Sequence, residues 1–178
     1  MKEECVTVYT ASIQETVSLG ENLGAALRRG DVIALVGELG SGKTWFTKGV
    51  ALGLGVSPDT IIASPSFSLL NEYEGRYPLY HMDAYRLERS ADFLSAGLDE
   101  YFYKDGVAVL EWADRWPEVL PDWRLKIAFT ITDDFSRKIV LSGYYPRPVE
   151  ILKDMAGHGT GIVENGIEGI SGSEYIKE

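Results

Sequence analysis

The length, composition and charge of this chain narrow its class before any motif is considered. It has 178 residues, of which 45% are hydrophobic, so we expect one domain with a sizeable core. The formal net charge of −10 argues against independent binding to nucleic acid or an anionic membrane, because both need clustered Lys and Arg. A basic protein, or nucleic acid held by a partner, is compatible with this charge. Cys5 is the single cysteine, so no intrachain disulfide can form. The sequence shows neither a signal-peptide pattern nor a bilayer-spanning run, and we expect a cytoplasmic protein.

The first third of the chain alternates between strand and helix patterns. Ser12 and Glu15 have capping-box spacing at the start of an amphipathic segment that Gly30 ends. The continuous apolar run at 31–36 is typical of a strand that is buried on both faces. We therefore predict a strand at 5–9, a helix from Ser12 to about Arg29, a strand at 31–36, and a helix that begins by Lys43 and ends near Leu54.

The rest of the chain adds hairpins and one more buried strand. We predict a hairpin of 67–73 and 77–82, a helical segment at 90–103 interrupted by Gly97, a buried strand at 107–110, and a hairpin of 124–132 and 137–141. The expected fold is an α/β, P-loop NTPase-like three-layer sandwich, whose mixed sheet is mostly parallel at its centre and carries added antiparallel hairpins. We assign residues 1–143 to this domain. Glycines recur among polar residues after Tyr144, so residues 144–178 are expected to be a mobile, Gly-rich tail.

Eight consecutive residues match the phosphate-loop pattern G-x-x-x-x-G-K-[ST]: Gly37, Glu38, Leu39, Gly40, Ser41, Gly42, Lys43 and Thr44. The glycines let backbone N–H groups point at phosphate oxygens, and the helix that follows adds its N-terminal dipole. Lys43 would reach the β and γ phosphates of ATP or GTP, and the Thr44 hydroxyl would bind Mg²⁺. Trp45, directly after the loop, is a further nucleotide-binding candidate. The alternative is a glycine-rich turn with an exposed lysine.

Phosphoryl chemistry also needs a carboxylate at the end of a neighbouring strand. Asp83 and Glu111 each end an apolar run, so both are candidates for the Mg²⁺ side and for catalysis beside Lys43, although either could make a cap or a salt bridge instead. His81 is more simply explained as structural than as a general base. Trp112 could pack on the nucleotide, shape a partner surface or lie in the core.

The sequence leaves the roles of two further features open. Arg86 could stabilise transition-state charge or pair with a nearby acid. The segment Ser64-Pro65-Ser66-Phe67 has the position of a switch loop, in which Ser66 would sense the γ-phosphate and Mg²⁺, but it could also be an ordinary turn.

These blocks, in this order, resemble the TsaE family of bacterial ATPases. The resemblance rests on the phosphate loop, on Ser64-Pro65-Ser66-Phe67, on His81-Met82-Asp83-Ala84-Tyr85-Arg86 and on Glu111-Trp112, and it extends from about Val6 to Leu141. The loop alone is shared by many NTPases. The block from His81 to Arg86 and the pair Glu111-Trp112 make the match specific. The family usually has Thr where this chain has Ser66, and the segment after Tyr144 matches nothing in the family pattern.

The resemblance implies a role in making N6-threonylcarbamoyladenosine at position 37 of tRNAs that read codons starting with adenine. Proteins of this family bind the TsaD and TsaB proteins and hydrolyse ATP to ADP with Mg²⁺, so contact with tRNA would be indirect. In family terms Thr44 and Glu111 would lie on the Mg²⁺ side, and the segment from Thr10 to Ser12 would lie near the adenine. Asp83 and Trp112 would be needed for activity or coupling.

Two alternatives remain at the level of sequence. A small-molecule kinase would use the same loop, but it usually needs an acceptor-binding segment and an arginine-rich lid, for which residues 54–106 leave little room. A nucleotide-gated binding module would bind ATP with negligible hydrolysis. The chain has no Asn-Lys-x-Asp guanine pattern, which favours ATP over GTP only weakly.

Overall fold

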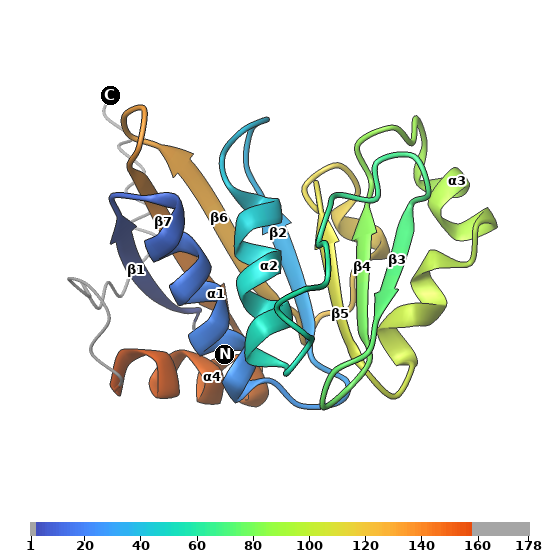
Figure 1. Cartoon of the computed structure of the whole chain (residues 1–178). Coiled ribbons are helices and arrows are strands. Elements are labelled where there is room, and N and C mark those ends of the chain that lie inside the picture. Colours follow the sequence, from blue (N-terminus) through green and yellow to red (C-terminus); the bar gives the residue numbers. More distant parts are fainter. Residues whose placement is uncertain (1–2, 158–178) are drawn as a thin grey trace, which may run out of the picture.

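A computed structural model describes residues 3–157 of the chain (Figure 1). The strands are β1 (Glu4–Thr10), β2 (Val32–Val36), β3 (Leu70–Tyr73), β4 (Leu79–Asp83), β5 (Val107–Glu111), β6 (Leu125–Ile131) and β7 (Arg137–Gly143). The α-helices are α1 (Ile13–Ala26), α2 (Lys43–Gly53), α3 (Ser90–Ser95) and α4 (Pro146–Gly157), and two 3₁₀ turns are η1 (Leu98–Tyr103) and η2 (Pro117–Val119). Both hairpins and the break at Gly97 agree with the sequence predictions.

The strands form one mixed sheet in the order β1-β7-β6-β2-β5-β4-β3. Strands β6, β2, β5 and β4 run parallel at its centre, whereas β7, β1 and β3 add antiparallel edges, as predicted. The parallel register sets Asp83 beside Glu111, and Glu111 beside Leu35 of β2. The carboxyl ends of the three strands therefore meet at one edge, the upper edge in Figure 1.

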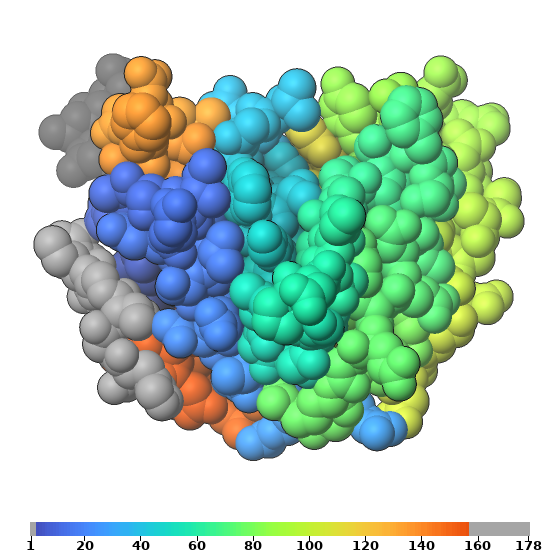
Figure 2. Space-filling model, in the orientation of Figure 1, coloured from blue at the N-terminus to red at the C-terminus, as the bar shows by residue number. Residues whose placement is uncertain are grey.

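Helices cover both faces of the sheet and give the predicted three layers. Helices α1, α2 and α4 share one apolar cluster with the sheet, and α3 and η1 share a second cluster on the opposite face. Figure 2 shows α1, α2 and the residues after them as a continuous surface over the first face. Among residues 3–157, no helix combines the length and the apolar character that crossing a bilayer requires.

Helices α1 and α2 pack backbone against backbone. A Cβ added to Gly20 of α1 would lie 2.3 Å from the carbonyl oxygen of Phe46, and one added to Gly49 of α2 would lie 2.0 Å from that of Val17. No side chain larger than hydrogen fits at these positions unless the helices separate. This close approach fixes α2, and therefore its first residue Lys43, against α1.

Helix α1 begins as predicted but ends earlier. The Ser12 hydroxyl accepts the backbone N–H of Glu15 at 3.1 Å, which caps the first turn. The helix ends at Ala26 rather than near Arg29, because Leu27 is already extended, with ψ at 150°. The backbone N–H of Arg28 instead donates to the Asp31 carboxylate at 2.8 Å, so a local side-chain acceptor replaces the last helical turn.

Helix α4 corrects the domain boundary expected at residue 143. Its side chains Ile151, Leu152 and Met155 are buried in the cluster shared with α1 and α2, so the packed domain continues past the first proline of the expected tail. Arg147 anchors the helix through two hydrogen bonds to the Asp31 carboxylate, at 2.8 and 3.0 Å. The expectation for 158–178 concerns residues outside the described range.

Candidate functional site

The phosphate loop connects the end of β2 to the start of α2. Gly42 precedes the helix with φ at 106°, a left-handed conformation that favours glycine and turns the chain into α2. The following residues, Lys43 and Thr44, therefore begin the helix at the edge where β4 and β5 end. The first helical N–H groups have no partner within the helix, so they are available to an anion.

Lys43 is folded onto its own loop. Its ammonium donates to the carbonyl oxygens of Gly37 at 2.6 Å and Glu38 at 2.9 Å. Lys43 as a whole residue is 4% exposed. Burial lowers the pKa of Lys43 below its usual 10.5, and the nearby charges of Glu111 and Asp83 oppose that shift. The ammonium is thus held close to the loop by oxygen acceptors that a phosphate could replace.

Glu111 ends β5 and joins Thr44 to His81. The Thr44 hydroxyl donates to the Glu111 carboxylate oxygens at 2.9 and 3.2 Å. His81 Nε2 lies 2.8 Å from Glu111 Oε1, and His81 is fully buried in β4. A carboxylate only accepts, so Nε2 carries the proton that links the two side chains. Among the described residues, His81 Nδ1 is a buried atom with no hydrogen-bond partner.

Asp83 ends β4 and is tied to both neighbouring loops. The Ser64 hydroxyl donates to one of its carboxylate oxygens, and the backbone N–H of Tyr85 donates to the other at 2.7 Å. Asp83 is 2% exposed, so these donors offset the cost of burying its charge. Within the expected switch segment, Ser64 is the residue that hydrogen-bonds to Asp83. Ser66 and Ser64 both line the cavity over the phosphate loop that is described below.

Trp112 turns the chain sharply after Glu111. Its φ is 62°, a left-handed conformation that a bulky residue rarely adopts. The ring lies against Tyr85, with centroids 4.8 Å apart and planes tilted by 38°, and its centroid is 4.0 Å from the ammonium of Lys43. Trp112 therefore lies over Lys43 on one side and packs against the apolar cluster below α3 and η1 on the other.

Arg137 holds the loop from outside and was not found from sequence. From the first position of β7 its guanidinium donates to the carbonyl oxygens of Ser41 at 3.0 Å and Gly40 at 3.2 Å. The sequence marks Arg137 only as the start of a hairpin strand. No local pattern signals the contact, because the loop and the strand are 96 residues apart and meet only through the sheet order.

Two cavities meet at the loop. The first, of about 450 Å³, lies over the loop, and Ser64, Tyr85 and Arg86 form part of its wall. The rest of its lining consists of predicted site residues: Leu39, Gly40, Ser41, Gly42, Lys43, Thr44, Trp45, Ser66, Asp83, Glu111 and Trp112. A second, of about 240 Å³, is lined by Ser12, Ile13, Thr16, Gly40, Gly42, Trp45, Asp134, Phe135 and Arg137. The structure therefore brings the predicted residues to one place, apart from Gly37 and Glu38, whose carbonyls bind Lys43 from beneath.

The donor set fits a nucleotide triphosphate with Mg²⁺. The Thr44 hydroxyl and the carboxylates of Glu111 and Asp83 are the hard oxygen ligands that Mg²⁺ prefers. The Lys43 ammonium and the free N–H groups at the start of α2 are matched to phosphate oxygens. A strand, a glycine-rich loop and a helix with these side chains at the carboxyl edge of a parallel sheet define a P-loop nucleotide-binding protein.

Comparison with known proteins identifies the family. Residues 10–139 match the family described as Threonylcarbamoyl adenosine biosynthesis protein TsaE, and the chain belongs to it. The chain is 41% identical over 150 residues to tRNA threonylcarbamoyladenosine biosynthesis protein TsaE of Bacillus subtilis (84% of this chain, 92% of the relative). It is 43% identical over 131 residues to the protein of that name from Treponema pallidum (74% of this chain, 96% of the relative).

A solved structure agrees with the sequence relatives. The crystal structure of YdiB from Bacillus subtilis superposes with a TM-score of 0.77 at 36% identity, and the match covers 89% of this chain and 98% of that one. The predicted α/β fold and the resemblance to the TsaE family are therefore confirmed.

Proposed function

We propose that this protein is an Mg²⁺-dependent ATPase that supports formation of N6-threonylcarbamoyladenosine in tRNA by binding and resetting a complex of TsaD-like and TsaB-like proteins. The observation that carries the catalytic part is the position of Glu111, hydrogen-bonded to Thr44 at 2.9 Å at the mouth of a complete phosphate loop. Membership of the TsaE family supports the part that concerns tRNA modification.

The two adjoining cavities suggest how ATP would lie. Its phosphates would occupy the cavity over the loop, and its base would enter the smaller cavity beside Ser12 and Trp45. The Lys43 ammonium would exchange its carbonyl partners for phosphate oxygens, and Arg137 would keep the loop backbone in place during that exchange. Bound Mg²⁺ would neutralise charge on the phosphates.

The residues around Glu111 would prepare it for hydrolysis. With Thr44 turned toward the metal side, His81 would still hold one Glu111 oxygen, which leaves the other free to orient a water molecule and accept its proton. Asp83, fixed by Ser64 and Tyr85, would act on the same side of the site. Release of the γ-phosphate would free Ser64 and Ser66 to move, which would end the bound state.

The surface around the site supports docking of a partner protein. Leu39, which lines the cavity, and Phe67, which contacts the lining residue Arg86, are 74% and 81% exposed, and apolar side chains that protrude near a functional cavity are typical of interaction surfaces. With a net charge of −10 the chain is suited to a basic partner, which could hold the tRNA itself. Binding of ATP would then control when this protein and its partner associate.

The partner proposal is tested by co-purification. The tagged full chain is incubated in native lysate with Mg²⁺ and either a non-hydrolysable ATP analogue or ADP. We expect TsaD-like and TsaB-like proteins to be retained with the analogue, and to be lost from the Lys43→Ala variant, which keeps the surface but not the nucleotide. Retention that is equal in all three samples would contradict nucleotide control of binding.

A second assay separates the proposal from a small-molecule kinase. Purified protein is given ATP and Mg²⁺ without any acceptor, and phosphate release is followed before and after the partner proteins are added. An ATPase turns over under these conditions and is accelerated by partners. A kinase would form ADP only when an acceptor hydroxyl is supplied, and it would leave the phosphoryl group on that acceptor instead of releasing it as phosphate.

A further inference from the structure

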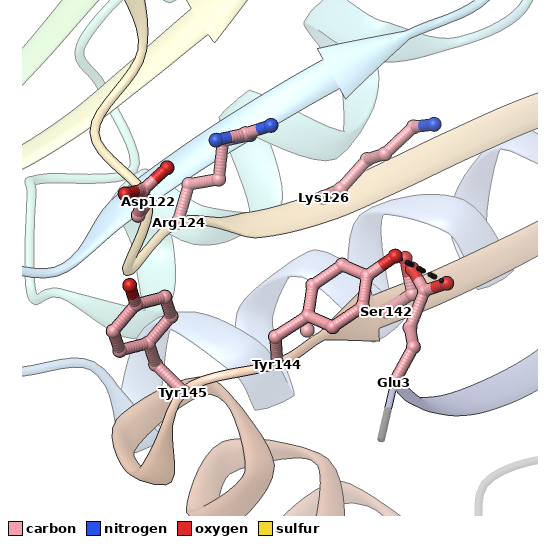
Figure 3. A pocket seen from close by; sticks show the side chains of 8 residues that line it. Glu3, Asp122, Arg124, Lys126, Ser142, Tyr144 and Tyr145 are labelled. Atoms are coloured by element: carbon pink, nitrogen blue, oxygen red, sulfur yellow. Dashed lines mark hydrogen bonds between the residues drawn. The ribbon is translucent and has the colours of Figure 1, made fainter. Parts of the chain in front are cut away.

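A separate hollow of about 380 Å³ lies at the opposite edge of the sheet from the phosphate loop (Figure 3). It is lined by the start of β6, the end of β7 and the residue before β1: Glu3, Asp122, Arg124, Lys126, Ser142, Gly143, Tyr144 and Tyr145. Because β6 runs parallel to β2, its first residues are at the edge where the parallel strands begin. The hollow therefore shares no residue with the nucleotide site.

Two basic side chains project from one face of β6 into this hollow. Arg124 and Lys126 are two residues apart and so lie on the same side of the strand. Within residues 3–157, Lys126 has no hydrogen-bond or ion-pair partner, and Arg124 uses one guanidinium nitrogen on the carbonyl of Pro121 at 2.9 Å. The remaining donors of both side chains are available to a ligand.

The hydroxyl groups beside them complete a set of donors. Ser142 of β7 is directly opposite Lys126 in the register and is 8% exposed, and among the described residues its hydroxyl has no hydrogen-bond partner. The Tyr144 hydroxyl donates to the Glu3 carboxylate at 3.0 Å, which occupies one carboxylate oxygen but leaves the negative charge of Glu3 in the hollow. Glu3 also raises the pKa of Tyr144, which keeps its phenol protonated.

The position of the charges, and not their sum, selects the ligand, because Glu3 and Asp122 balance Arg124 and Lys126 in formal charge. Arg124 and Lys126 are adjacent and repel one another, and an anion bound beside both lowers that repulsion. The free donors of Arg124 and Lys126 match the oxygens of a carboxylate or a phosphate, which accept several charged hydrogen bonds. Asp122 is the one acid of the hollow without a partner among the described residues, and it is exposed on the loop before Arg124.

We propose that this hollow is a second binding site, independent of ATP, for a small molecule that carries an oxyanion, either a carboxylate or a phosphate monoester. The oxyanion accepts hydrogen bonds from Arg124 and Lys126, and Ser142 on the neighbouring strand lines the same hollow. The tyrosine rings form the apolar wall for the rest of the molecule. Asp122 repels the anion and weakens its binding, so its removal tightens the site.

The test is a site-resolved titration of the full chain by NMR, with inorganic phosphate in one series and acetate in the other. We expect saturable shifts at the backbone amides of Lys126, Ser142 and Gly143, and the stronger of the two series identifies the chemistry of the ligand. Shifts at the phosphate loop report on the proposed nucleotide site instead. Failure of either site is therefore visible independently of the other.

Charge variants provide the decisive comparison. Arg124→Gln and Lys126→Gln should each weaken binding about tenfold, as expected for loss of a charged hydrogen bond, and Asp122→Asn should tighten it about threefold. Lys138→Gln is the matched control, because Lys138 lies on the same face of the neighbouring strand and does not line the hollow. Absence of saturable shifts at the hollow, or equal effects of all four variants, overturns the proposal.

Discussion

Substitution of His81 by leucine should separate the activity of this site from the stability of the fold. His81 is fully buried and its Nε2 lies 2.8 Å from Glu111 Oε1. Leucine is close to histidine in size but offers no donor, so Glu111 would keep only its bond from Thr44. The bond from Thr44 would break when the Thr44 hydroxyl turns to bind a metal ion. In the leucine variant Glu111 would then have no hydrogen bond that fixes its position.

The expected change in the free energy of unfolding is small because two contributions oppose each other. Loss of a hydrogen bond to a charged group costs about 1.5–3 kcal/mol, whereas removal of the partnerless Nδ1 relieves a desolvation penalty of about 1–3 kcal/mol. The net effect should stay below about 2 kcal/mol. Loss of a residue that orients a ligating carboxylate typically costs about 10–100-fold in activity, and we expect kcat to fall by that factor.

The assay is steady-state ATP hydrolysis with partner proteins present, together with urea unfolding of each variant. His81→Gln is the matched control, because its side-chain amide can donate to Glu111 from nearly the same position as Nε2. We expect His81→Gln to recover most of kcat, and the KM for ATP to stay within about twofold in both variants. Wild-type kcat in His81→Leu, or equal losses in the two variants, would refute the positioning role.

Three further predictions concern the support of the site. Arg137→Lys should weaken ATP binding about tenfold, measured by calorimetry, because lysine lacks the planar fork whose Nε and Nη2 hold the Ser41 and Gly40 carbonyls; unchanged affinity would mean that the loop is rigid without Arg137. Gly49→Ala should lower the free energy of unfolding by about 1–3 kcal/mol, since its Cβ would overlap the Val17 carbonyl, and a neutral result would show that the helices can separate freely. Arg147→Ala should cost about 3 kcal/mol by leaving the buried Asp31 carboxylate unpaired, and Arg147→Ala with Asp31→Ala should be less destabilised than the sum of the single variants.

Much of the fold can be predicted from sequence because its signals are local. The apolar run of β2, the capping pair Ser12 and Glu15, and the pattern of the phosphate loop each depend on residues a few positions apart. The juxtaposition of Asp83 and Glu111 also follows, since the ends of neighbouring parallel strands meet at one edge. Their roles in binding and hydrolysis stay predictions.

The features that sequence reasoning missed depend on contacts across the chain. Arg137 reaches the phosphate loop only because β7 lies beyond β6 in the sheet order. Helix α4 begins with two prolines in its first turn and precedes a glycine-rich segment, so its composition suggests a tail, yet the bond between Arg147 and Asp31 fixes it to the domain. The orientation of the Trp112 ring over Lys43 likewise comes from a left-handed φ that no residue type there predicts.

The central claim is that Glu111 ends the ATP-bound state by hydrolysis. Single-turnover hydrolysis of ATP, with Mg²⁺ and partner proteins in excess, tests it directly when wild type is compared with Glu111→Gln. Glutamine keeps the size and a hydrogen bond to Thr44 but cannot accept a proton from water. We expect the variant to bind ATP within about threefold of wild type and to hydrolyse it at least about 100-fold more slowly. Hydrolysis at the wild-type rate would contradict the claim.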